Sequence, residues 1–219
     1  MSLWASAINR WAKSLPAWWL LALDLAERAA LVGLFGWLVL RMFTAYAAKG
    51  AWADLILVPS EGIVVFLVLI RRTTPNVSRR PSDWLLAFTA TTAPLLVQTS
   101  LGRAFLPPII GAAMMFAGMI LQIYAKIALG RSFGCVPANR GVKRCGPYCY
   151  VRHPMYAGYM LIHVAFFLLN PTAWNLAMYV LCDSLQIPRL LAEERLLRDD
   201  PKYRDYAAVV RYRLLPGVF

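Results

Sequence analysis

Six apolar stretches separated by short polar segments constrain the fold of this chain more than any other feature of its sequence. They cover residues 25–47, 52–70, 84–100, 105–129, 155–170 and 172–187. A helix that crosses a bilayer needs about 20 apolar residues, with a range of roughly 17–25. The first four stretches reach that length. The last two are shorter, and Asn170-Pro171 between them breaks a helix, so we expect a tight hairpin that barely spans the bilayer or is partly re-entrant.

The composition agrees with a membrane protein. Hydrophobic residues make up 60% of the 219 residues and charged residues only 16%, whereas soluble domains hold about 45–50% and about 25%. We therefore predict an all-α polytopic membrane bundle with five or six spanning helices. Residues 1–104 are expected to hold N-terminal membrane helices, and residues 105–219 a polar loop, the hairpin and a C-terminal tail. The tryptophans of the first twenty residues predict an interfacial helix.

The net charge of +12 comes from basic residues placed between apolar runs rather than on one solvated face, which disfavours nucleic-acid binding. These residues gather in segments 71–80, 131–152 and 189–213, whereas the opposite connections hold little beyond Lys49 and Arg103. Because positively charged loops stay in the cytosol, we predict that both termini and these basic segments are cytosolic. The abundance of Ala, Leu and Arg suggests a bacterial inner membrane.

Glu61 and His163 are ionisable residues near the middle of two of the apolar stretches. A carboxylate at bilayer depth, such as Glu61, is a functional candidate because it is expensive to place there. Alternatively, Pro59 starts a shorter helix and Glu61 occupies its first turn, where negative charge is favoured. We leave both interpretations open. His163 is expected to be hydrogen-bonded within the bundle rather than catalytic.

The cysteines do not indicate a metal centre. Cys135, Cys145 and Cys149 fall in a predicted cytosolic loop, where disulfides are rare. Together with His153 they could be zinc ligands, but their spacing is not that of common zinc modules, in which paired ligands lie two to four residues apart in matched sets. We predict no metal site.

Two polar clusters, residues 140–159 and 187–217, flank the expected hairpin, which returns the chain to the same side of the membrane so that they can meet. The first supplies arginine, histidine, tyrosine hydroxyls and the amides at the start of a helix, a combination suited to a carboxylate. The second supplies the adjacent carboxylates Glu193 and Glu194, suited to an ammonium group or to ribose hydroxyls. These residues alone indicate a zwitterionic or nucleotide ligand.

Several motifs in the last 90 or so residues resemble one known family. They are LGRSF at 129–133, GPY at 146–148, RHPMYAG at 152–158 and RLLAEE at 189–194. In this order and spacing they resemble the isoprenylcysteine carboxyl methyltransferase and phospholipid methyltransferase superfamily of integral membrane enzymes. The resemblance implies that S-adenosylmethionine donates a methyl group to a lipophilic or lipid acceptor that arrives from the bilayer.

The resemblance also implies roles for particular residues. The cofactor pocket would be lined by Tyr148, His153, Pro154, Met155 and Tyr156, with backbone from Arg140, Gly141, Val142 and Lys143, where this chain departs from the family's usual run. Glu193 would hold the amino end of the cofactor. Arg189, one helical turn earlier, would face the acceptor, and Glu194 would be the base if the acceptor were an amine or a thiol.

Other interpretations stay open. His153 could simply cap the helix that starts at Pro154, and Glu193 and Glu194 could pair with nearby arginines on a solvated helix. A membrane reductase that uses NADPH carries a stretch similar to RHPMYAG. The acceptor could be a phospholipid amine. A scaffold or transporter is the non-enzymatic alternative, although no internal repeat of the kind found in transporters is visible.

Overall fold

The computed structural model describes residues 17–49, 52–98 and 103–219. Within these ranges the fold is all-α, with seven α-helices and no strand, as the sequence predicts. The α-helices are α2 (Ala17–Lys49), α3 (Trp52–Ile70), α4 (Pro81–Thr92), α5 (Pro108–Leu129), α6 (Pro154–Leu169), α7 (Ala173–Leu197) and α8 (Pro201–Val209). Short 3-10 turns are η1 (Ala93–Leu96), η2 (Gly130–Ser132) and η3 (Gly146–Cys149). The expected interfacial helix falls mainly on residues 1–16, outside the described part.

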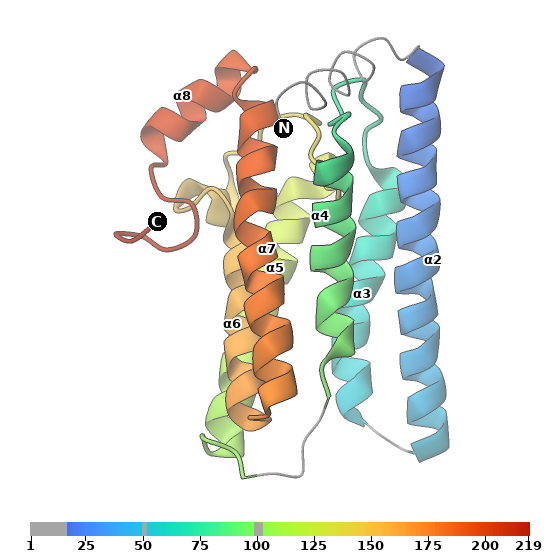
Figure 1. The fold of residues 1–219 in the computed structure, drawn as a ribbon, viewed down its shortest axis with the longest axis vertical. Coiled ribbons are helices and arrows are strands. Elements are labelled where there is room, and N and C mark those ends of the chain that lie inside the picture. The colour runs from blue at the N-terminus through green and yellow to red at the C-terminus, as the bar shows by residue number, and fades with distance from the viewer. Residues whose placement is uncertain (1–16, 50–51, 99–102) are drawn as a thin grey trace.

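Helices α2 to α7 run side by side along the long axis, and α8 lies across one end of the bundle (Figure 1). The loops that follow α3 and α5 reach this same end, which we call the α8 end. There the backbone amide of Arg72 donates to the carbonyl of Arg131 at 2.8 Å, and that of Ser78 to Pro137 at 2.8 Å. The basic segments predicted to share one side of the membrane therefore do gather at one end of the molecule.

Two expected helix limits are wrong. Within the stretch 84–100, Val97 and Gln98 are not helical, because Pro94 has no amide to donate and α4 gives way to the 3-10 turn η1. The helix expected over residues 172–187 does not end there: α7 continues through Pro188 to Leu197. A single helix of 25 residues therefore connects the hairpin to the polar cluster that contains Arg189 and Glu193.

The predicted hairpin is confirmed. Helix α6 ends at Leu169, and the hydroxyl oxygen of Thr172 caps α7 by accepting from the amide of Asn175. The side chain of Asn175 is fully buried and bonds to the carbonyls of Asn170 and Gln98. This turn places the start of α6 and the end of α7 at the α8 end.

Helices α5 and α6 pack in close contact through glycines. A Cβ atom added at Gly158 would lie 2.9 Å from the carbonyl oxygen of Gly118 and 3.0 Å from the amide nitrogen of Gln122. Gly111 is similarly covered by the side chain of Leu169. Small residues allow helix backbones to approach closely in membranes, and here they fix α6 against α5.

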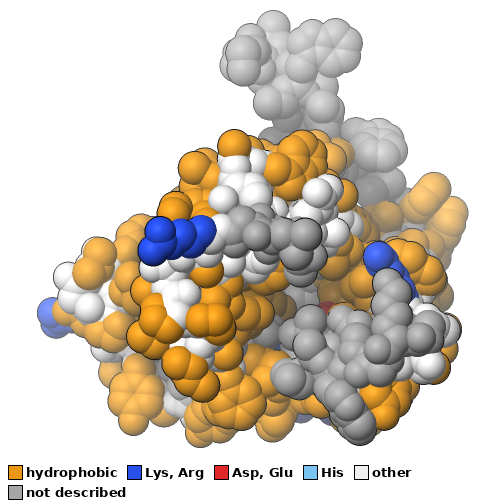
Figure 2. Space-filling model, turned by 90° about the horizontal axis from the view of Figure 1, so that it is seen from below, with side chains coloured by type: hydrophobic (Ala, Val, Ile, Leu, Met, Phe, Trp, Pro, Cys, Tyr) orange, Lys and Arg blue, Asp and Glu red, His pale blue; other side chains and the backbone are white. Residues whose placement is uncertain are grey.

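The outer faces of the bundle are apolar. Leu40, Leu85, Ile109 and Val180 are each more than half exposed, and such broad apolar exposure is unusual for a soluble monomer. Seen from the end opposite α8, hydrophobic side chains cover most of the described surface and few basic ones interrupt them (Figure 2). By length and composition, one helix of the described residues is able to cross a membrane, Pro108–Ser132, with Val58–Ile70 and Pro154–Leu169 as shorter apolar helices.

Candidate functional site

The two polar clusters of the sequence meet at the α8 end. The hydroxyl of Tyr156 on α6 donates to Glu193 Oε2 on α7 at 3.2 Å. His153 Nε2 lies 3.2 Å from Glu194 Oε1. The C-terminal tail joins them, since the amide of His153 donates to the carbonyl of Arg213 at 2.8 Å. The predicted convergence of residues around His153 and Glu193 is therefore confirmed.

Glu194 is the centre of a buried ion-pair cluster. Its side chain is 1% exposed and accepts from Arg152 at 2.9 Å and Arg213 at 3.1 Å, with Arg198 at 3.5 Å and His153 also in contact. The expected pairing of Glu194 with a neighbouring arginine is thus present through Arg198. The alternative that His153 caps α6 is wrong, because its side chain makes no capping hydrogen bond.

The cations around Glu194 control its protonation. Glu194 lies outside the expected membrane-spanning segment 172–187. Burial raises the pKa of its carboxyl, but the hydrogen bond from His153 and the charges of Arg152 and Arg213 together lower that pKa to about 2. A carboxylate with so low a pKa is a weak proton acceptor at neutral pH. The arrangement therefore disfavours Glu194 as a general base.

The low pKa of Glu194 predicts a loss of stability in acid. A carboxyl whose pKa is lower in the folded chain stabilises the fold fully above its unfolded pKa and loses that contribution as pH falls toward about 2. We expect the melting temperature to fall as pH drops from about 5 to 3, reflecting on the order of 2–3 kcal/mol. Thermal unfolding across this range in Glu194→Gln should show a clearly weaker dependence. An equally steep dependence in the variant would contradict the assignment.

Arg189 is a buried cation without a carboxylate partner. Its side chain lies in the interior, where Nη2 donates to the carbonyl of Cys135 at 3.2 Å and Nη1 to the amide oxygen of Gln186 at 3.4 Å. The guanidinium also lies over the ring of Tyr156, 5.4 Å from its centroid. Its Nε has no hydrogen-bond partner. Among the described residues no carboxylate oxygen lies within ion-pair distance of Arg189, and the Glu193 carboxylate acts on it only from farther away.

The loop after η2 is held by α2, which the sequence analysis did not include in the site. Glu27 is completely buried, and its Oε1 accepts from the amides of Cys135 and Val136 at 2.9 and 3.0 Å. Arg71 Nη1 lies 2.9 Å from the same oxygen. Glu27 therefore fixes the backbone that carries the carbonyl bonded to Arg189.

The side chain of Arg140 joins this network. Its Nη2 lies 3.4 Å from a carboxylate oxygen of Asp24 and 3.4 Å from one of Glu27. The guanidinium also packs against Gly134, where the Cβ of any other residue would lie 2.2 Å from Arg140 Nη1. Asp24 also pairs with Arg28 at 2.8 Å. The guanidinium of Arg140 is thus engaged with α2, and only its backbone could serve a ligand. Glu27 near the start of the apolar stretch 25–47, with Asp24 one turn before it, was the sequence signal that could have indicated this network.

The other predicted cofactor residues form part of the core beside Glu193. Tyr148, Pro154 and Met155 are buried, and burial together with the nearby Glu193 carboxylate raises the pKa of Tyr148 well above its ordinary value. Val142 packs half-buried against the same core cluster. Gly141 is exposed with a φ of 102°, a conformation that favours glycine. Lys143 is half-buried on the same loop.

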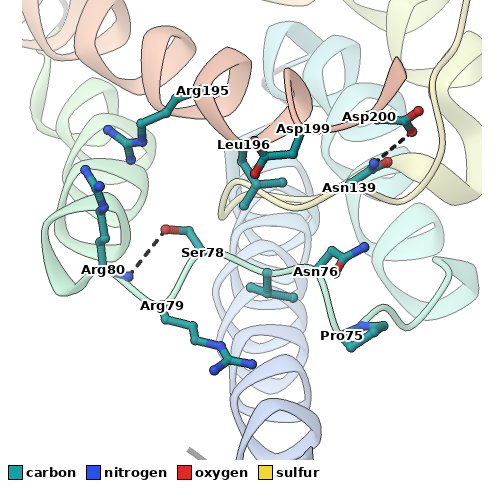
Figure 3. A pocket seen from close by; sticks show the side chains of 11 residues that line it. Pro75, Asn76, Ser78, Arg79, Arg80, Asn139, Arg195, Leu196, Asp199 and Asp200 are labelled. Carbon is teal, nitrogen blue, oxygen red and sulfur yellow. Dashed lines mark hydrogen bonds between the residues drawn. The ribbon is translucent and has the colours of Figure 1, made fainter. Parts of the chain in front are cut away.

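A separate cleft of about 720 Å³ opens at the α8 end. It lies between the loop 75–80 and the end of α7, and Asn139 from the loop after η2 completes its wall (Figure 3). Figure 3 shows Arg80 and Arg195 on one side of the cleft and Asp199 and Asp200 on the other. None of the predicted cofactor-binding side chains lines it. The cleft is therefore distinct from the Tyr156–Glu193 contact.

His163 and Glu61, the ionisable residues near the middle of two apolar stretches, both interact with other residues of the bundle. His163 Nδ1 lies 2.7 Å from Asp183 Oδ1 on α7, which confirms that His163 is hydrogen-bonded within the bundle. Cys182 completes a group whose ligand atoms lie within 4.8 Å of one another. Pro59 lies inside α3, so the suggestion that a helix starts there and leaves Glu61 in its first turn is wrong. Glu61 is half-buried and interacts electrostatically with Lys126 on α5.

The groups beside Glu193 suit S-adenosylmethionine by their chemistry. Within the described part of the chain the Glu193 carboxylate accepts a hydrogen bond from Tyr156, and a carboxylate has further acceptor capacity for an ammonium group. Buried tyrosine rings and the aromatic contact between His153 and Tyr156, 5.6 Å between centroids, provide apolar and hydrogen-bonding surface. The guanidinium of Arg189 lies on the same face of α7, one turn away.

Comparison with known proteins gives a family for part of the chain. Residues 106–200 match the family model described as phospholipid methyltransferase. This match confirms the family resemblance indicated by the motifs. No curated protein sequence matches the chain. The solved structure of the eukaryotic intramembrane Ras methyltransferase, isoprenylcysteine carboxyl methyltransferase, is similar over 100% of this chain and 88% of that chain, with 18% identity and a TM-score of 0.46.

Proposed function

We propose that this chain is an S-adenosylmethionine-dependent membrane methyltransferase whose acceptor is a lipophilic molecule with a carboxylate head. The match of residues 106–200 to the phospholipid methyltransferase family supports the first part. The observation that carries the second part is the buried guanidinium of Arg189, which has no carboxylate partner among the described residues. Burying a charge without a counter-charge is unfavourable, and an anionic acceptor would supply one.

We propose that the cofactor binds beside Glu193. The carboxylate of Glu193 holds its ammonium group, Tyr148, His153, Pro154, Met155 and Tyr156 form the wall, and the backbone of residues 140–143 closes the loop side. When bound, the cofactor supplies a methyl group already activated on a sulfonium. The task left to the protein is to position the acceptor and to exclude water.

A carboxylate acceptor suits the groups of this site better than an amine. An amine or thiol has to lose a proton, and the candidate base Glu194 is held by Arg152, His153, Arg198 and Arg213 with a pKa of about 2. A carboxylate is already deprotonated at neutral pH and needs orientation alone. Arg189 supplies that orientation with a planar guanidinium that matches a carboxylate.

We further propose that five or six helices cross the membrane, that the α8 end is cytosolic, and that the membrane is a bacterial inner membrane. The proposal rests on the gathering of segments 71–80, 131–152 and 189–213 at that end. On this arrangement residues 1–104 form a membrane-embedded support and residues 105–219 the methyltransferase core.

The test of the proposed function is incubation of purified protein and a membrane lipid extract with methyl-labelled S-adenosylmethionine. Carboxyl methylation yields an ester, so the label in the lipid fraction should be released by mild base. Base-stable label would instead indicate methylation of an amine, as in phospholipid methylation, and would overturn the carboxylate assignment. Calorimetric titration with S-adenosylmethionine and with NADPH separates a methyltransferase from a reductase, since only the former cofactor is expected to bind.

A further inference from the structure

Lys126 is a second buried cation in the interior of the bundle. Its side chain, on α5, is 1% exposed, and Nζ donates to the hydroxyl and the carbonyl of Ser60 on α3 at 3.0 and 3.3 Å. No carboxylate oxygen of the described residues lies within ion-pair distance of Nζ. The ammonium group is therefore held by neutral oxygens.

Other polar groups surround Lys126. Gln122 lies one turn earlier on the same face of α5, is 4% exposed, and its amide oxygen has no hydrogen-bond partner. Nζ lies 5.6 Å from the ring centroid of Tyr159 on α6. The Glu61 carboxylate acts on Lys126 from beyond contact distance. A buried acceptor atom without a partner and a buried ammonium thus face the same region between α3, α5 and α6.

The tyrosines of α6 connect Lys126 to Arg189. Tyr156 and Tyr159 are three residues apart and share one helix face. The guanidinium of Arg189 lies over Tyr156, and the ammonium of Lys126 lies over Tyr159. The hydroxyl of Tyr159 also feels the charges of both Arg189 and Glu61. The two cations, neither of which contacts a carboxylate of the described residues directly, therefore flank the same aromatic face one helical turn apart.

A purely structural role does not explain a cation at this place. Taking an ammonium group out of water is unfavourable unless it is paired, and charged groups at membrane depth generally mark functional sites. The contact with Ser60 could be made by a neutral side chain. Two carboxylates act on these cations from beyond ion-pair distance, Glu193 on Arg189 and Glu61 on Lys126. Since Glu193 is assigned to the ammonium group of the cofactor, an anionic acceptor would supply the direct contact that both cations lack.

We propose that Lys126 is a second acceptor-binding residue, and that it and Arg189 bind the anionic head of one amphiphilic acceptor from opposite ends of the Tyr156–Tyr159 face. This inference rests on the proposed function and narrows the acceptor to a molecule whose head carries an oxyanion and whose tail lies in the bilayer. Glu61 keeps the site selective, because its charge opposes the acceptor unless Lys126 is present. Tyr159 supplies a neutral hydrogen-bond donor between the two cations.

The probes are palmitate, hexadecanol and hexadecylamine, used as competitors of labelled methyl transfer to a membrane lipid extract. They share one chain length and differ in the charge of the head. We expect palmitate to inhibit the wild-type protein most strongly. Lys126→Met should raise the inhibition constant of palmitate about tenfold, the effect of losing one charge-assisted contact, while changing that of hexadecanol little. Glu61→Gln should lower the constant for palmitate, because a repelling charge is removed.

Controls separate binding from folding. Lys126→Gln keeps a hydrogen-bond donor toward Ser60 without the charge, so it should show the same loss even if the Met variant folds poorly. Lys202→Met removes an exposed lysine of α8 and should leave all three inhibition constants unchanged. Binding of S-adenosylmethionine, measured by titration calorimetry, should stay within about twofold in every variant.

Three outcomes would contradict three different claims: the role of Lys126, the oxyanion class of the acceptor and the proposed function. Unchanged inhibition by palmitate in both Lys126 variants, with cofactor binding intact, would remove Lys126 from the acceptor site and leave the proposed function standing. Stronger inhibition by hexadecylamine than by palmitate would overturn the oxyanion class. Failure of the wild-type protein to bind S-adenosylmethionine would instead overturn the proposed function itself.

Discussion

Replacing Arg189 by Met is expected to lower kcat/KM for methyl transfer by about 100-fold, the size typical of removing one partner from a buried charge pair. The melting temperature should stay the same or rise, because Met fills a similar volume and removes a buried charge that contacts no carboxylate of the described residues directly. A labelled-methyl assay and thermal unfolding of the same preparations measure both effects. A lower kcat/KM together with an unchanged or higher melting temperature would indicate that Arg189 acts in substrate binding rather than in folding.

Matched variants sharpen the Arg189 test. Arg189→Lys keeps the charge but loses the planar fork, so its kcat/KM should fall between those of the wild type and the Met variant. Arg204→Met removes an exposed arginine of α8 and should be silent in both measurements. If Arg189→Met kept kcat/KM within about twofold, or unfolded the protein, Arg189 would be a structural residue and the carboxylate proposal would lose its main support.

The second large effect is expected at Glu27. Glu27→Gln preserves the shape of the side chain but removes the negative charge that faces Arg71 and Arg140, and breaking a buried ion pair costs about 3–5 kcal/mol. We expect a clearly lower melting temperature. Since Glu27 Oε1 also holds the amides of Cys135 and Val136, affinity for S-adenosylmethionine should fall as well.

The control for Glu27 is Asp205→Asn, which neutralises an exposed carboxylate of α8 and should change neither measurement. A variant that loses stability but binds the cofactor normally below its melting temperature would show that α2 braces the bundle without positioning the loop. Unchanged stability would contradict the ion-pair network itself.

The sequence was sufficient to predict the elements whose signals are local. The hairpin follows from Asn170-Pro171 between two apolar runs, and the meeting of His153 with Glu194 follows from that hairpin. The end of α7 was missed because the expected segment was bounded by its apolar residues, which stop at residue 187. Pro188 is accommodated within the helix, which continues to Leu197.

The supporting network was missed for a different reason. Glu27 contacts Cys135 and Val136 across more than 100 residues of sequence, and no local pattern indicates which loop a carboxylate will hold. Lys126 was passed over because a lysine near the end of an apolar helix usually extends its ammonium group to the membrane surface. Its inward direction depends on Ser60 of α3, which only the packing of the helices determines.

Pro188 lowers the bending stiffness of α7 immediately before Arg189. Without an amide at this position the carbonyl of Ser184 has no partner in the usual helical ladder, and bending there meets less resistance than elsewhere in the rod. We therefore expect that a tilt of the first half of α7, for example in a thinner bilayer, moves Arg189 and Glu193 less than it would in an uninterrupted helix.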